Sequence, residues 1–198
     1  MFKKHNCPFA IYVTTDFPVK KELLWHYHLQ DVLLKNTILK INGEEYDCSD
    51  LEKKDQTFRA IREKLFTNDS EKTLDALTQL FIDNANVVMY DVKALSWEQI
   101  AELATDPLCT IGAHTVSHPA LTVLNDEEIR KELSEGKKII EEKIKKPVHH
   151  FAYPFGKWDN RVASLAMEQY KTAVLASGGL VRRGDALDRL NRSDLDEK

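Results

Sequence analysis

The sequence lacks the features of exported, membrane-spanning and disulfide-rich proteins. No run of residues approaches the roughly 18 apolar positions that a membrane span needs. The amino terminus has no apolar segment followed by a small-residue cleavage site. Three cysteines (Cys7, Cys48 and Cys109) without Cys-x-x-Cys spacing favour buried or free thiols in a reducing compartment over a disulfide framework. As written, the chain is expected to be cytoplasmic, unless sequence upstream of Met1 hides a leader.

An excess of positive charge is also missing. The chain holds 28 lysines and arginines against 32 aspartates and glutamates, a net charge of -4, so it has no electrostatic footprint for nucleic acid. With 42% hydrophobic and 30% charged residues, the composition is that of a soluble globular protein. A chain of this length is expected to form one domain with a sizeable insertion.

The second half of the chain alternates between β-prone and helical segments. Strands are predicted at residues 86–90, 109–113, 148–153 and 172–176. Ser96 and Gln99 have capping-box spacing for a helix through Ala104, Asn125 caps a long helix, and Asp159 or Asn160 starts another. This order predicts an α/β fold with parallel strands and helices packed outside them.

The first residues fit the same scheme. Residues 3–6 resemble the last turn of a helix, and residues 9–14 form a strong strand immediately afterwards. A parallel strand normally follows another through a helix, so we expect a missing amino-terminal strand. The open sheet edge left by that loss would promote pairing with another chain, which predicts a homodimer.

Residues 17–85 interrupt the alternation and are predicted to be a mostly helical insertion, so that the barrel domain comprises residues 1–16 and 86–198. Asn42-Gly43 is a hairpin turn signal inside the insertion. The segment is interpreted as a cap packed beside the barrel, with a substrate-shaping lid as the alternative. His26 and His28 should point to different sides of a helix and are not expected to share a ligand. Three groups of apolar residues have helical spacing: Trp25, Leu29, Val32 and Leu33; Phe58, Ile61 and Leu65; and Leu74, Leu77 and Phe81.

The stretch from His114 to Pro119 carries the clearest sign of chemistry. His114 and His118 stand four residues apart in a turn bracketed by Gly112 and Pro119, directly after a predicted strand. Imidazole is the commonest protein metal ligand, and a catalytic divalent site usually takes three protein ligands and leaves one position for water. The stretch therefore supplies two of three ligands, although a pair of surface or capping histidines is the alternative interpretation.

Residues 97–156 resemble the polysaccharide deacetylase family, also described as the NodB homology domain and carbohydrate esterase 4-like. Three blocks carry the resemblance: Trp97-Glu98-Gln99-Ile100, the run from Ile111 to Leu121, and Phe151-Ala152-Tyr153-Pro154-Phe155-Gly156. The last block is a form of its motif that is familiar in a bacterial branch of the family. Residues 9–15 are similar to the second barrel strand of the family. The resemblance implies a distorted (β/α)7-type barrel and metal-dependent removal of an acyl group, usually acetyl, from an N-acetylated amino sugar or polysaccharide.

The resemblance also implies roles for individual residues. His114 and His118 match the two histidine ligands of one divalent metal, with zinc expected first and cobalt, nickel or manganese as alternatives. Thr115 and Ser117 would orient these ligands through hydrogen bonds. The backbone N–H of Phe155 would stabilise the tetrahedral oxyanion. The segment Tyr153, Pro154, Phe155 and Gly156 matches the family's substrate groove.

Several family features are missing. The Asp-Asp motif that supplies the general base and the third metal ligand does not occur, in agreement with the expected loss of the first strand, and Asp16 and Asp91 are weak substitutes. No histidine follows His150, so the family's general acid is not found either. His149 and His150 open a strand at the far end from the expected site and are interpreted as structural.

A base-orienting arginine is absent as well. Many family members carry it where this chain has Ala152, which leaves Arg189 and Arg192 as candidates to replace it. Three hypotheses follow: a deacetylase that lacks its first motif, a catalytically inactive relative that binds a glycan or a protein through the same groove, and a soluble barrel fragment stabilised by association.

Overall fold

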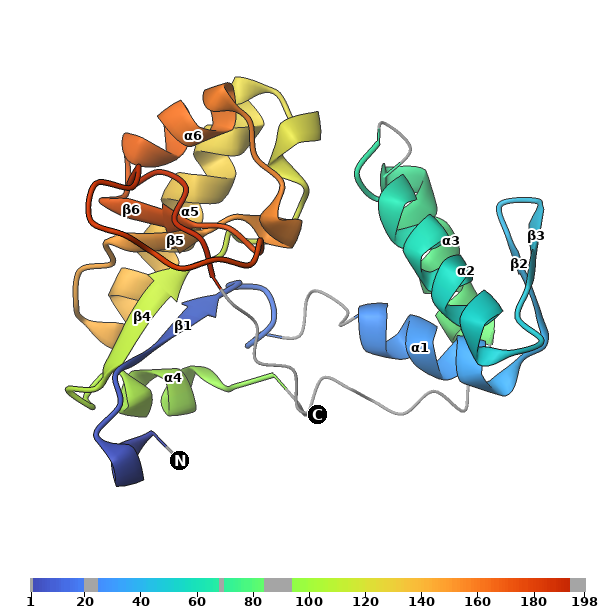
Figure 1. The fold of residues 1–198 in the computed structure, drawn as a ribbon, viewed down its shortest axis with the longest axis horizontal. Helices are drawn as coiled ribbons and strands as arrows, with labels where there is room; N and C mark the ends of the chain where they lie inside the picture. Colours follow the sequence, from blue (N-terminus) through green and yellow to red (C-terminus); the bar gives the residue numbers. More distant parts are fainter. Residues whose placement is uncertain (1, 20–24, 68–69, 84–93, 193–198) are drawn as a thin grey trace. The chain divides into compact units, whose positions relative to one another are not determined.

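A computed structural model describes residues 2–19, 25–67, 70–83 and 94–192. The chain divides into two compact units (Figure 1). The first contains Met1–Lys21 and Leu95–Lys198, and the second contains Glu22–Ala94, whereas the sequence predicted boundaries at residues 16 and 86. The predicted strand at residues 86–90 lies outside the described residues.

The first unit is built on a sheet of four parallel strands in the order β1-β4-β5-β6. These strands are β1 (Phe9–Val13), β4 (Cys109–Ala113), β5 (His150–Ala152) and β6 (Thr172–Val174). The α/β class with a parallel sheet is thereby confirmed. The strands β5 and β6 are shorter than predicted: β5 begins two residues later and ends one residue earlier, and β6 ends two residues earlier.

Helices of the first unit begin where the capping residues predict. These helices are η1 (Lys3–His5), α4 (Trp97–Leu103), η3 (Leu121–Val123), α5 (Asp126–Ile144), η4 (Pro154–Gly156) and α6 (Asn160–Met167). Ser96 and Asn125 each form a complete capping box, and Asp159 accepts from the backbone of Val162. The predicted helix end at residues 3–6 is the short 3-10 turn η1. Helix α5 ends at Lys145, which takes the left-handed conformation at φ 55°.

The core of this unit lies between the sheet and its helices (Figure 1). Ile129, Leu133, Gly136 and Ile140 form a buried stripe along α5, with the spacing of one helix face. Phe151 of β5 is fully buried against them. Each buried isoleucine, leucine or phenylalanine side chain stabilises the fold by about 1.5–3 kcal/mol, so burial of these side chains holds α5 on the sheet.

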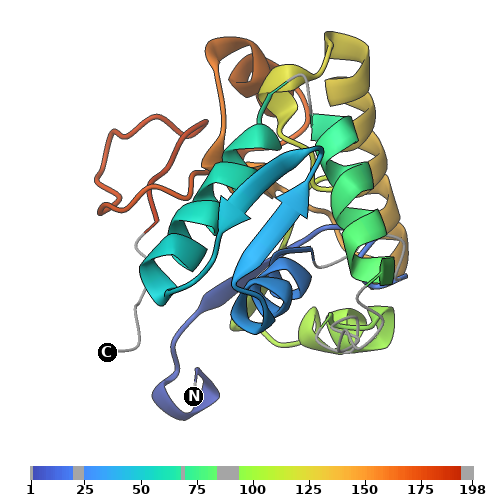
Figure 2. The same cartoon turned by 90° about the vertical axis from the view of Figure 1, so that its right-hand side faces the viewer.

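In its described residues, the second unit consists of three helices and a hairpin (Figure 2). Asn42 and Gly43 join the two strands with φ values of 51° and 79°, as a type I′ turn requires. Leu29, Ile61 and Leu77 of the three helices are buried together with Cys48. The predicted helices and hairpin are confirmed: α1 (Trp25–Lys35), β2 (Ile38–Ile41), β3 (Glu44–Asp47), α2 (Leu51–Lys64) and α3 (Ser70–Asp83).

The three cysteines are free thiols, as the sequence predicts. In the second unit His28 packs against Phe81, whereas His26 contacts the ring of Tyr27, so the two histidines have different surroundings. Among the described residues, no helix combines the length and the apolar character that crossing a membrane requires.

Candidate functional site

His114 follows the carboxyl end of β4, at the edge of the sheet where parallel strands of α/β proteins place their sites. Its backbone N–H donates to the carbonyl of Val13 on β1, at 2.9 Å. Its Nδ1 lies 2.7 Å from the carbonyl oxygen of Ala152 on β5. Because a carbonyl oxygen only accepts, Nδ1 carries the proton and the lone pair of the neutral ring lies on Nε2.

The two predicted metal ligands face each other through the same ring atom. The Nε2 atoms of His114 and His118 lie 3.1 Å apart. If both nitrogens were bound to one ion at about 2.05 Å, this separation would correspond to a nitrogen–ion–nitrogen angle of about 98°. That angle lies between the octahedral and the tetrahedral values. Burial lowers the pKa of His114 to about 4, aided by the charge of Arg192 and opposed by the Ala152 hydrogen bond, so the ring is neutral at pH 7. The pair fits a divalent ion in donor type and in spacing.

Within residues 2–19, 25–67, 70–83 and 94–192, no three histidine, cysteine, aspartate or glutamate side chains lie close enough to hold one ion. The backbone of Asp16 contacts the loop between the two histidines, since its N–H donates to the carbonyl of Val116 at 3.0 Å. Its side chain does not complete a set of three ligands. Asp91 lies outside the described residues. Of the residues proposed as ligands, His114 and His118 are the two that lie together in the described part of the chain.

The loop between the two histidines has a strained backbone. Thr115 and His118 have φ values of 68° and 61°, in the left-handed region that β-branched residues avoid. Such conformations cost about 1–3 kcal/mol each and need support from their surroundings. Thr115 is fully buried; its hydroxyl accepts from the N–H of His118 at 3.0 Å and donates to the carbonyl of His114. The hydroxyl predicted to orient the site therefore connects both histidines.

Ser117 has a different partner, which the sequence did not reveal. Its N–H and its hydroxyl both donate to the carboxylate of Glu132 on α5, at 3.1 and 2.8 Å. The N–H of Val116 donates to the same carboxylate at 2.8 Å. One turn further along α5, a Cβ on Gly136 would lie 3.1 Å from the backbone carbon of Thr115. In the sequence, the one indication of this contact was the position of Glu132 directly before Leu133, a residue of the apolar stripe of α5.

The loop after β1 lies against the same histidine loop. The Thr14 hydroxyl donates to the carbonyl of His114 at 2.9 Å, and the N–H of Thr15 donates to the carbonyl of Thr115 at 3.2 Å. The ring of Phe17 is 6.1 Å from the ring of His118. These contacts extend the β1–β4 pairing beyond the strands and place an aromatic ring next to the second histidine.

The segment predicted to line the substrate groove forms the other side of the site. The ring of Phe155 meets the ring of His118 edge to face, with centroids 4.5 Å apart. Tyr153 and Pro154 are buried, and the Tyr153 hydroxyl donates to the carbonyl of Asp188 at 2.7 Å. Tyr153 and Pro154 therefore anchor the segment through their buried side chains, whereas Phe155 and Gly156 are partly exposed.

Backbone conformation explains the glycine in that segment. Gly156 has a φ of 66°, and a Cβ there would lie 2.7 Å from the Cβ of Ala176. Phe155, at φ 57°, is also left-handed although it carries a side chain. The turn holds Phe155 against His118 at a cost in backbone strain.

The two candidate arginines have separate surroundings. Arg189 pairs with Asp188 through two contacts of 2.9 Å and lies over the ring of Trp158 at 4.5 Å. The Nε of Arg192 donates to the carbonyl of Leu175 at 2.7 Å, and its charge acts on the His114 ring. Of the two, Arg192 is the one whose charge contributes, after burial, to the lowered pKa of His114.

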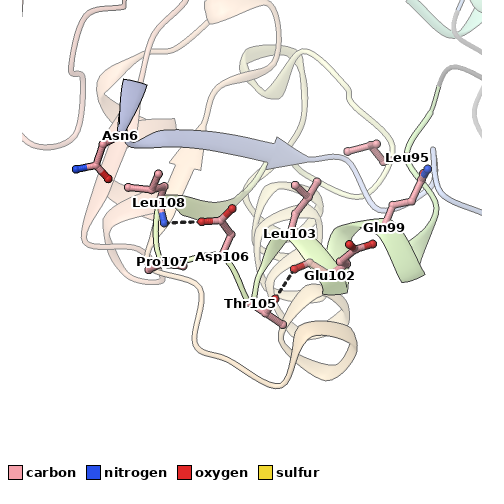
Figure 3. A pocket seen from close by; sticks show the side chains of 9 residues that line it. All are labelled: Asn6, Leu95, Gln99, Glu102, Leu103, Thr105, Asp106, Pro107 and Leu108. Carbon is pink, nitrogen blue, oxygen red and sulfur yellow. Dashed lines mark hydrogen bonds between the residues drawn. The ribbon is translucent and has the colours of Figure 1, made fainter. Parts of the chain in front are cut away.

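Two further features lie toward the amino-terminal ends of β4 and β5. His150 opens β5, and its Nδ1 is 2.8 Å from the hydroxyl of Thr172. A pocket of about 730 Å³ lies near the amino-terminal end of β4 (Figure 3). Hydrogen bonds within its lining shape the turn before the strand, including one of 3.0 Å from the N–H of Leu108 to Asp106. Leu108 of the pocket lies six residues before His114, roughly 20 Å along an extended chain. His150 is nearer, because its carbonyl oxygen would lie 3.0 Å from a Cβ on Gly112, two residues before His114.

Known proteins resemble this chain over different lengths. Chitin deacetylase 1 of Cryptococcus neoformans var. grubii is 40% identical over 65 residues, which are 33% of this chain and 14% of that protein. The deacetylase domain of BpsB from Bordetella bronchiseptica is 13% identical with a TM-score of 0.57. A de-N-acetylase from Aggregatibacter actinomycetemcomitans is 11% identical with a TM-score of 0.51. Each structural likeness covers 97% of this chain and 62% of the other, and shows that the fold is shared.

The chain therefore spans less than two thirds of the length of these relatives. The family model described as polysaccharide deacetylase matches residues 51–174, more than half of the sequence. This match includes the histidine pair, the loop between the histidines and the segment that carries Phe155. The chain belongs to the polysaccharide deacetylase family.

Proposed function

We propose that this chain forms part of a metal-dependent deacetylase that hydrolyses the acetamide bond of an N-acetylated amino sugar in a polysaccharide. The observation that carries the proposal is the 3.1 Å approach of the His114 and His118 Nε2 atoms at the carboxyl edge of a parallel sheet. The similarity to a chitin deacetylase over 65 residues supports the class of substrate.

His114 and His118 would hold one divalent ion, with zinc as the first expectation. Such an ion supplies polarisation of the amide carbonyl and a water whose pKa is lowered toward about 7. A third protein ligand is usual at catalytic sites, and we expect it, together with the general base, from a part of the protein beyond the described residues.

The chain's own residues prepare the site. The Ala152 carbonyl keeps the proton of His114 on Nδ1, so that Nε2 is available as a ligand. The Thr115 hydroxyl fixes the backbone of His118 relative to His114. We assign the backbone N–H of Phe155 to the oxyanion of the tetrahedral intermediate, because its ring already lies against His118.

Arg192 is the candidate for the missing arginine. Burial is the main cause of the lowered pKa of His114, and the charge of Arg192 adds to it, which supports a position of Arg192 near this ring. A cation there would stabilise negative charge on the base or on the intermediate. Arg189 is engaged by Asp188 and Trp158 and is not assigned this role.

An acetate-release assay tests the proposal. N-acetylglucosamine oligomers would be incubated with this chain, and with a version extended upstream, in the presence of zinc or of a chelator. We expect release that the chelator abolishes and that His114→Ala removes, while His149→Ala leaves it unchanged. Turnover retained in His114→Ala would refute the ligand role.

A catalytically inactive, glycan-binding relative is the second candidate, favoured by the absence of a third ligand among the described residues. Metal titration separates the two functions. Two neutral histidines should give weak binding, whereas an additional carboxylate should give tight stoichiometric binding.

We also propose that the protein is a homodimer. In the described part of the chain, β1 pairs with β4 on one side and ends the strand order on the other. An exposed edge of this kind pairs readily with a second copy. Strictly monomeric light scattering across micromolar concentrations would contradict the proposal.

A further inference from the structure

We propose that Glu132 is a positioning residue for the metal-binding pair and acts through the loop that joins His114 to His118. The inference rests on the proposed function, because it concerns how the two histidines are held ready for an ion. Glu132 lies on α5, 14 residues beyond His118, and belongs to none of the motifs that identify the family.

The Glu132 carboxylate meets three donors of the loop. Its Oε2 accepts from the N–H groups of Val116 and Ser117 at 2.8 and 3.1 Å, and its Oε1 accepts from the Ser117 hydroxyl at 2.8 Å. All three contacts lie between the two histidines in sequence. Hydrogen bonds to an ionised acceptor are about twice as strong as neutral ones, so this residue is a major anchor of the loop.

The loop needs such an anchor because its backbone is unfavourable on both sides of Ser117. Thr115 and His118 are both left-handed, with φ values of 68° and 61°. Without an external anchor, the backbone of His118 would relax toward the ordinary region of φ and carry the imidazole with it. The 3.1 Å spacing of the two Nε2 atoms therefore depends on contacts outside the histidines.

Helix α5 has a second adaptation to the same loop. Gly136 lies one turn after Glu132, and its missing side chain lets the backbone of Thr115 approach to 3.1 Å from where a Cβ would stand. The buried stripe with Ile129 and Leu133 holds this helix face on the core. Because α5 contacts the loop at two points, it fixes the position of the loop relative to the sheet.

Glu132 is not itself a ligand in this arrangement. Its oxygens face backbone N–H groups and a hydroxyl, and in the described parts of the chain it forms no cluster of three ligand side chains with the histidines. Its expected effect is on the affinity of the site for a metal. Loss of groups that orient ligands typically lowers metal affinity by about 10- to 100-fold.

The test measures metal affinity, not activity. Glu132→Gln would be compared with the wild-type chain and with Glu135→Gln, which makes the same charge change at an exposed position of α5. Zinc affinity would be determined by competition with a chromophoric chelator, the cobalt(II) absorption spectrum would report ligand geometry, and thermal melting without metal would report folding.

We expect Glu132→Gln to bind zinc about 10- to 100-fold more weakly and to alter the cobalt spectrum, with Glu135→Gln unchanged. A folded Glu132→Gln protein with wild-type affinity and spectrum would overturn the inference, even if its melting temperature fell, because its role would then be structural only. If Glu132→Gln does not fold, Ser117→Ala, which removes one of the three donors, should still weaken zinc binding by a few fold; unchanged affinity in that variant would equally overturn it. Absence of zinc and cobalt binding in the wild-type chain would instead refute the proposed metal site.

Discussion

The Nδ1 of His114 lies 2.7 Å from the carbonyl oxygen of Ala152, so a backbone group of β5 selects the tautomer of a side chain that follows β4. The contact joins two segments 38 residues apart in sequence. It directs the lone pair of the neutral ring toward His118, where the second Nε2 stands at 3.1 Å. The parallel sheet thereby orients the ring of His114, one of the two proposed ligands.

The first prediction concerns this tautomer. In the metal-free protein at pH 7, long-range nitrogen-proton NMR spectra should show His114 with the proton on Nδ1 and a bare Nε2, because the Ala152 carbonyl can only accept. His149, for which the structure gives no such backbone acceptor, serves as the comparison and should show exchange between tautomers. A His114 ring protonated on Nε2 would contradict the assignment.

Replacing Thr115 by valine should destabilise the protein. The change keeps the shape of a fully buried side chain but leaves the N–H of His118 without its 3.0 Å acceptor. An unsatisfied buried donor costs about 1–3 kcal/mol, which urea unfolding of the metal-free protein would measure. The matched control is Thr110→Val at an exposed position of β4, expected within about 0.5 kcal/mol of the wild type. Equal effects of both changes would show that the Thr115 hydroxyl is not needed.

At Phe155 we expect the glycine variant to be more stable than the alanine variant. Both changes remove the ring that packs on His118, but only glycine relieves the left-handed backbone at φ 57°. The difference in unfolding free energy should be about 1 kcal/mol in favour of glycine. At Lys157, where φ is -81°, the same pair should show the opposite order. Alanine as the more stable variant at both positions would refute a strained Phe155.

Asp47 of the second unit should titrate abnormally. The Lys53 ammonium, which donates to its carboxylate at 2.7 Å, and Ser49 lower the pKa of Asp47 from 3.8 to about 2. A carboxyl that is more acidic when folded stabilises the fold above pH 3.8, and this contribution is lost as the pH falls through about 2.

Carbon-detected NMR of the Asp47 carboxyl checks this value. Lys53→Met should raise the pKa toward its ordinary value, and so should high salt, since the pair is exposed to solvent. Lys40→Met, which removes the neighbouring partner of Glu45, should leave Asp47 unchanged. An unperturbed Asp47 in the wild type would contradict the ion pair.

Features encoded by neighbouring residues could be read from the sequence. The capping boxes at Ser96 and Asn125 and the Asn42-Gly43 turn depend on side chains and backbone a few residues apart, so composition and spacing suffice to predict them. The same holds for His114 and His118, whose spacing and position after a strand predict a shared site. The assignment of these two histidines as metal ligands stays a prediction.

Only the tertiary structure decided which distant groups complete the surroundings of that pair. Glu132, the Ala152 carbonyl and the ring of Phe155 reach the histidine loop from other elements, at separations of 15 to 38 residues along the chain. Arg192 and Arg189 are equal candidates in sequence, and the fold brings the charge of Arg192 to His114 while Asp188 and Trp158 hold Arg189. Local patterns determine where helices and turns begin, whereas contacts between elements depend on the packing of α5 and the sheet, which no short stretch of sequence contains.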